Sequence, residues 1–133
     1  MNSKERMLAA IHHEEPDRVP VGEWQFGREL IEPVVGRGTL FPPDLRRLKA
    51  FWEGKRDQAI ADWKTGLVKL VRELGWDAVL VHLAIGKNTP IDVPEKIGES
   101  KWRDSNGNIL FYSEETDRMF KTGKDPDFTP PPS

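Results

Sequence analysis

The sequence contains no cysteine. The chain therefore cannot form a disulfide, a thiolate zinc site, an iron–sulfur cluster or a cysteine nucleophile from its own residues. Net charge is also nearly absent, because 20 Lys and Arg residues balance 22 Asp and Glu residues to leave a formal charge of −2. This balance lacks the basic surface that binds nucleic acid or an anionic membrane, so neither is expected as a partner.

Long apolar runs are missing as well. The longest, residues 78–85, includes His82 and is far shorter than the roughly 20 apolar residues that cross a bilayer. The first residues lack the apolar stretch of a secretory signal, so we expect a cytoplasmic protein. Only 37% of residues are hydrophobic and 32% are charged, against about 45–50% and about 25% in ordinary globular domains. One modest core is therefore expected.

Three segments have the apolar periodicity of helices. For residues 3–13 either Asn2 or Ser3 can cap the first turn, and residues 44–52 begin with Asp44 as the cap. Residues 56–74 carry apolar side chains every three or four positions, which predicts the longest helix. Gly75 stands where a helix C-terminus favours glycine.

Strands are expected on both sides of that long helix. A short one follows Pro20, and residues 78–83 are apolar throughout, which favours a strand buried on both faces in a parallel sheet covered by helices. A helix, a glycine and a buried strand are half of a βαβ unit, so the fold class is α/β. The many Gly and Pro residues between positions 22 and 57 indicate largely irregular chain before and after the short helix.

The last third of the chain has a different pattern. Asn106-Gly107 lies between two strand-like stretches and predicts a β-hairpin over about residues 99–113. The proline-rich residues 122–133 are expected to be an extended or disordered tail.

Candidate binding residues follow the two strands expected around the long helix. Gln25 and Arg28 come after the first strand, and His82 lies near the end of the second, where ligand-facing groups collect in α/β folds. Arg28 either binds a carboxylate or phosphate or is an ordinary surface arginine. His82 either lines a pocket or is a core histidine satisfied by a backbone carbonyl. No zinc motif, phosphate-binding glycine loop or readable catalytic triad is present, so no catalytic residue is assigned.

Two motifs in the first half of the chain carry a family resemblance. The helix at residues 3–11 followed by E-P-D-R-V-P-V at residues 15–21, and then L-G-W-D at residues 74–77, resembles the N-terminal portion of the uroporphyrinogen decarboxylase-like superfamily. That superfamily includes the decarboxylase and the corrinoid-linked methyltransferases. Residues 102–116 resemble an insertion that is common in the methyltransferase-like members.

The resemblance implies the N-terminal part of a (β/α)8 TIM-type barrel with a β-hairpin insertion. Because such barrels take about 250 residues, residues 1–121 would form only a partial barrel. Its open sheet edges and apolar strand faces would need covering. The remainder of the barrel would come from another polypeptide or from another copy of the chain in an oligomer, unless the chain is a fragment.

The resemblance also suggests roles for single residues. Q-F-G-R at residues 25–28 matches the Gln-Ala-Gly-Arg stretch that binds substrate carboxylates in the decarboxylases, which implies such a role for Arg28. Trp24 replaces the arginine that precedes this stretch, and Ala84 falls where the decarboxylases have an essential aspartate. Decarboxylation of uroporphyrinogen is therefore not expected.

The methyltransferase branch remains as the expected function. Its members hold zinc through a His-x-Cys pair and a distant Cys, which this chain lacks, so zinc and a corrinoid would belong to a completed assembly. On this interpretation the chain lines the substrate pocket for methyl transfer to a corrinoid or thiol acceptor, is inactive alone, and has a corrinoid protein among its possible partners. The alternative is a stand-alone, non-catalytic module derived from this fold that binds a partner or ligand.

Overall fold

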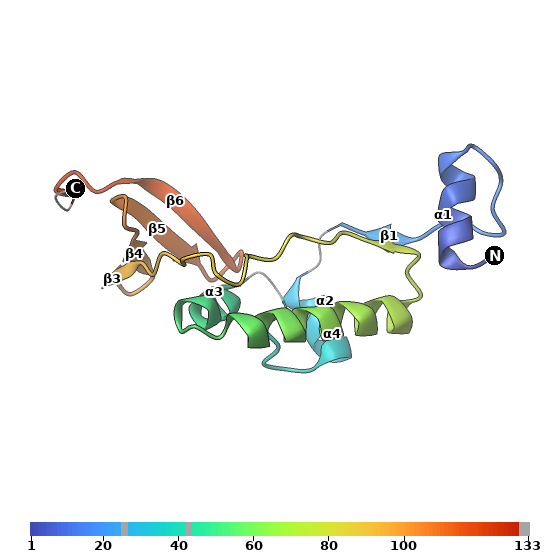
Figure 1. The fold of residues 1–133 in the computed structure, drawn as a ribbon, viewed down its shortest axis with the longest axis horizontal. Helices are drawn as coiled ribbons and strands as arrows, with labels where there is room; N and C mark the ends of the chain where they lie inside the picture. Colours follow the sequence, from blue (N-terminus) through green and yellow to red (C-terminus); the bar gives the residue numbers. More distant parts are fainter. Residues whose placement is uncertain (25–26, 42–43, 131–133) are drawn as a thin grey trace. The chain divides into compact units, whose positions relative to one another are not determined.

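A computed structural model describes residues 1–24, 27–41 and 44–130. The elements over these residues, in chain order, are α1 (Ser3–Ile11), β1 (Gly22–Glu23), α2 (Arg28–Val35), α3 (Leu45–Trp52), α4 (Arg56–Leu74), β2 (Ala78–Val79), β3 (Glu95–Gly98), β4 (Lys101–Arg103), β5 (Asn108–Ser113) and β6 (Arg118–Lys124) (Figure 1). None of the helices in these ranges is long and apolar enough to cross a membrane.

The chain divides into two compact units that alternate along the sequence. The first contains Met1–Pro42 and Ile60–Ile85, and the second contains Pro43–Ala59 and Gly86–Ser133. The helix α4 begins in the second unit and continues through the first.

The three helices predicted from periodicity are confirmed. At the start of α1, Asn2 and Glu5 form a capping box in which each side chain bonds the other's backbone N–H, both at 2.9 Å. Asp44 caps α3 by accepting from the Arg47 N–H, and α4 ends at Leu74 and is followed by Gly75, whose φ of +64° suits glycine. Polar caps thus mark the starts of α1 and α3 because they satisfy N–H groups that lack helical partners.

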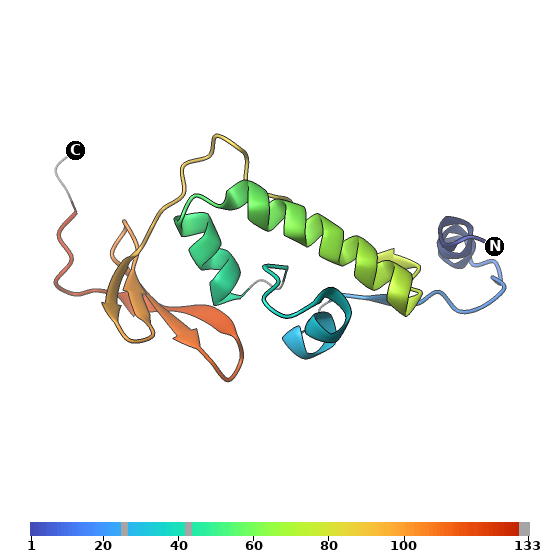
Figure 2. The ribbon, with the colours of Figure 1, turned by 90° about the horizontal axis from the view of Figure 1, so that it is seen from below.

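The expectation of irregular chain after the first strand is wrong where α2 forms. This helix has no side-chain cap and contains Pro33, which explains why local sequence signals do not indicate it. Its Ile31 is fully buried in the first unit's core with Phe41, Leu70 and Trp76. Burial of one apolar face therefore stabilises α2, and Figure 2 shows it lying beside α4.

The expected TIM-type barrel is also wrong. The described residues form one two-stranded parallel sheet, β1–β2, and one four-stranded antiparallel sheet in the order β3-β4-β5-β6. A barrel needs repeated parallel βα units, whereas the chain after β2 forms a succession of antiparallel neighbours. The local motifs thus specify one parallel pair and not the architecture that the resemblance implied.

The strand expected to be buried on both faces is much shorter and more exposed than predicted. β2 contains two residues, and only Val79 of these packs against the core. Beyond it, Val81 is 68% exposed and Leu83 is 100% exposed. An apolar run indicates what a segment would bury, but burial itself requires covering chain that the described residues do not supply.

In the second unit, the predicted hairpin is part of the four-stranded sheet. Gly107, with a φ of +76°, closes the turn between β4 and β5, and Asp104 Oδ1 accepts from the N–H groups of Asn106 and Asn108. Trp102 packs against Trp52 of α3, with ring centroids 5.9 Å apart. β6 continues to Lys124, so the start of the expected tail is a paired strand.

Candidate functional site

The amino ends of β1 and β2 are held by a cluster of four charged side chains. Asp77 is inaccessible to solvent and accepts from Arg6 Nη1 and from Arg18 Nη1, each at 2.6 Å. Its Oδ2 also accepts from the Val21 N–H at 3.0 Å. Asp17 binds the other side of Arg6, at 2.6 Å from Nε. The cluster therefore connects α1, the loop before β1 and the start of β2.

These contacts keep both carboxyl groups ionised. The Val21 N–H, together with Ser3, Arg18 and Arg6, holds the pKa of Asp77 well below its usual range, although burial acts against this. The Arg6 guanidinium holds the pKa of Asp17 similarly low. A buried carboxylate with two guanidinium partners and a backbone donor has its hydrogen-bonding capacity largely used inside the protein.

This cluster was not among the predicted site residues, although its members lie in the quoted motifs. Arg6 is in the first helix, Asp17 and Arg18 are in E-P-D-R-V-P-V, and Asp77 ends L-G-W-D. The sequence shows opposite charges at the borders of helix, loop and strand, but it does not show which of them meet. Because these four side chains bind one another, the residues of the motifs position the β1–β2 pair.

The carboxyl ends of β1 and β2 lie at the other end of the strand pair from the charged cluster. The strands run parallel with Gly22 opposite Ala78 and Glu23 opposite Val79, so both carboxyl ends lie at the same edge. A side chain on Gly22 would meet the Ala78 carbonyl oxygen at 2.8 Å, so the two strands approach closely there. Groups that follow the two strands are thereby brought to one end of the first unit.

Two of the predicted binding residues can be located at this end. Arg28 is the first residue of α2, half-buried, and its Nη1 lies 3.3 Å from Glu32 Oε1 one helical turn later. His82 follows β2 and is exposed rather than enclosed in the core, with its ring 6.1 Å from that of Trp63. Gln25 lies outside the described residues. No contact recorded within the described ranges joins Arg28 to His82.

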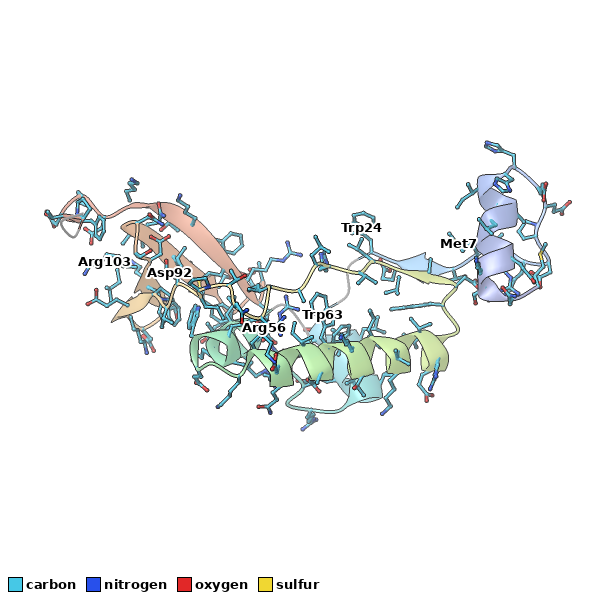
Figure 3. The ribbon with its side chains drawn as sticks, viewed as in Figure 1. Met7, Trp24, Arg56, Trp63, Asp92 and Arg103 are labelled. Carbon is cyan, nitrogen blue, oxygen red and sulfur yellow. The ribbon has the colours of Figure 1, made fainter. Side chains whose placement is uncertain are left out.

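Aromatic side chains border the same region. Figure 3 shows Trp63 on the side of α4 that faces the segment after β2, and Trp24 on the side of β1 away from α4. Trp63 packs against the core, whereas Trp24 is 68% exposed. Trp24 is therefore not part of the core of the first unit.

The donor set does not fit the zinc that the resemblance implied for a complete enzyme. The chain has no cysteine, and within the described ranges no three His, Asp or Glu side chains are grouped to hold a metal ion. This end of the sheet presents the Arg28 guanidinium at the N-terminus of α2, the exposed His82 and the indole rings of Trp24 and Trp63. Such groups can bind and orient an anionic or planar ligand.

Comparison with known proteins adds no family to this description. No family model, no curated protein and no solved structure matches the chain.

Proposed function

We propose that this chain supplies one wall of the substrate site of a uroporphyrinogen decarboxylase-like methyltransferase and requires a second polypeptide for activity. The supporting observation is the parallel pairing of β1 with β2, which leaves Arg28 and His82 after the carboxyl ends of neighbouring strands. In open α/β sheets this is the edge at which ligands bind.

Within the proposed site, Arg28 binds a carboxylate of the methylated substrate. A guanidinium can donate two parallel hydrogen bonds to a carboxylate, and the N-terminal end of α2 adds favourable partial charge. His82, whose ring is tilted by 34° to that of Trp63, is the second polar group that orients the substrate. The methyl-accepting chemistry is assigned to the partner polypeptide, because the sequence has no cysteine for the zinc site of this family.

Reconstitution with the product of an adjacent reading frame tests the proposal. Methyl transfer from a small methylated carboxylic acid to cob(I)alamin should require both polypeptides. In that complex, Arg28→Ala should weaken binding of the acid by about 2–5 kcal/mol, the scale for losing one member of a buried charge contact. The effect should appear as a higher KM.

Two further variants serve as controls. Arg37→Ala removes an arginine from the loop after α2, outside the proposed site, and should leave KM unchanged. Arg28→Lys keeps the charge without the planar fork and should recover only part of the binding. Activity of the chain alone, or an unchanged KM in Arg28→Ala, would reject the proposal.

A second function is favoured by a separate observation, the exposure of Val81 and Leu83. It is the non-catalytic module that binds a partner or ligand through this surface. A complex that forms with the adjacent product but shows no methyl transfer with any methylated acid would support it over the enzyme.

A further inference from the structure

The chain after β6 turns back onto the turn between β4 and β5. The Asp125 N–H donates to the Gly107 carbonyl oxygen at 2.8 Å, and the Phe128 N–H donates to the Asp125 carbonyl oxygen at 3.2 Å. The second bond closes a β-turn whose second position is Pro126, a position that proline favours. Residues 125–128 therefore form a strap across the β4–β5 turn.

The ring of Phe128 lies directly against Gly107. A Cβ atom on Gly107 would overlap Cδ1 and Cγ of that ring, so the ring occupies the space that a side chain would need. Gly107 also has a φ of +76°, which residues with side chains rarely adopt. The turn thus requires glycine for its backbone and, independently, for contact with the closed strap.

An ion-pair chain connects the strap to two strands. Asp125 Oδ2 lies 2.6 Å from Arg103 Nη1, and Arg103 Nη2 lies 2.6 Å from Glu95 Oε2. Arg103 is the last residue of β4, and Glu95 is the first residue of β3. The side chains of Asp125 and Arg103 are only 16% and 29% exposed, so their contact is partly shielded from solvent. One guanidinium thereby joins the strap to β3.

β3 is the part of the sheet that such a contact can influence most. It is an edge strand of four residues, all of them exposed, and it pairs with β4. Its register with β4 shifts between Lys96 and Gly98. Short edge strands with exposed side chains open at low free energy, so a single added contact changes how often they open.

We propose that residues 125–128 are a releasable strap whose closure on Gly107 holds Arg103 in place and so orders the edge strand β3. When the strap is closed, Asp125 fixes one side of the guanidinium and Glu95 binds the other. When the strap opens, Arg103 loses the partner that orients it, and β3 opens more often. A molecule that draws the strap away would therefore loosen this edge of the sheet.

The coupling is expected in local opening and not in overall stability. Partly exposed ion pairs contribute little to the free energy of unfolding. Amide hydrogen exchange followed by NMR detects local opening, so it is the appropriate measurement. The inference does not use Arg28 or methyl transfer, so it can fail or succeed independently of the proposed function.

Phe128→Ala tests whether the ring keeps the strap closed. The substitution keeps the backbone groups that form the strap but removes the ring from Gly107. The α-protons of Gly107 should lose the shift that a neighbouring aromatic ring causes. Exchange of the Asp125 N–H should become several-fold faster, and so should exchange of the β3 amides that pair with β4.

Asp125→Asn tests the connection through Arg103 separately. It removes the carboxylate that pairs with Arg103 and keeps the backbone bonds of the strap. The ring shift at Gly107 should therefore remain, whereas exchange of the β3 amides should again become faster. This variant also measures the coupling without removing an aromatic side chain.

Phe120→Ala is the matched control, because Phe120 is a 43% exposed ring on β6 of the same sheet. It should leave the Gly107 shift and the β3 exchange unchanged. The amides of β5, which lies between β4 and β6, serve as the internal reference and should exchange at the parent rate in all three variants.

Three results would overturn the proposal. An unchanged Gly107 shift in Phe128→Ala would show that the ring does not pack there. Faster exchange at Asp125 with unchanged β3 would show that the strap opens without affecting the edge. An equal increase in β5 would mean general destabilisation of the sheet.

Discussion

The two ends of the β1–β2 pair differ in whether the rest of the chain covers and binds their side chains. At the amino end, Asp77 is inaccessible to solvent and binds two arginines of the same chain. At the carboxyl end, Leu83 is wholly exposed on a segment without charge. At the amino end, charged side chains of the described residues bind one another. The carboxyl end presents apolar surface to solvent. Stability is therefore expected to depend on the amino end, and interactions with other molecules on the carboxyl end.

The largest expected effect comes from removing the charge at the centre of the amino end. Asp77→Asn leaves Arg6 and Arg18 without their shared carboxylate and weakens the contact with the Val21 N–H. Loss of one member of a buried charge cluster is strongly destabilising, so the melting temperature should fall more than for any other single acidic residue of the chain. Thermal unfolding followed by circular dichroism measures this.

Glu73→Gln is the matched control, since Glu73 is exposed on α4 a few residues earlier. Its melting temperature should stay close to that of the parent chain. Equal effects of the two substitutions would mean that the cluster does not hold the strand pair.

Acidification should weaken the same end in the unaltered chain. Asp77 and Asp17 have pKa values below their ordinary range in the folded chain, so the unfolded chain binds protons first as pH falls. Their contribution to stability is therefore complete above the unfolded pKa of about 3.9 and is lost progressively below it. Urea denaturation between neutral pH and pH 3 should show this loss, and Asp17→Asn should reduce the slope.

The smallest effect is expected at the carboxyl end. Leu83→Thr replaces a fully exposed leucine, so the free energy of unfolding should change by less than about 0.5 kcal/mol. A large loss of stability in the isolated chain would show that Leu83 is already buried in solution.

The parts of the fold that were predictable are those encoded by neighbouring residues. The caps at Asn2 and Asp44, the apolar repeat of α4 and the glycine at position 75 indicate three helices because each signal acts within one or two turns. The turn at Gly107 is local in the same sense. By contrast, α2 has no cap and includes Pro33, and it depends on burial of Ile31 against distant residues.

The candidate site was predictable only in part. The order of strand and helix indicates that Arg28 and His82 follow two strands, and the structure pairs these strands in parallel. The exposure of His82 and its contact with Trp63 depend on how the chain folds back along α4. The four-residue cluster at the amino end joins positions as far apart as Arg6 and Asp77, so no local pattern predicts it.

The sequence by itself determined the absence of thiol chemistry, the near-neutral charge, three of the helices and the hairpin turn, because composition and short-range periodicity decide these properties. Only the tertiary structure decided that Asp77 is enclosed by two arginines and that Leu83 remains in solvent. The charged Asp77 and the apolar Leu83 lie on one short stretch of the chain. Asp77 is buried and Leu83 is exposed because burial depends on which distant segments cover each side chain.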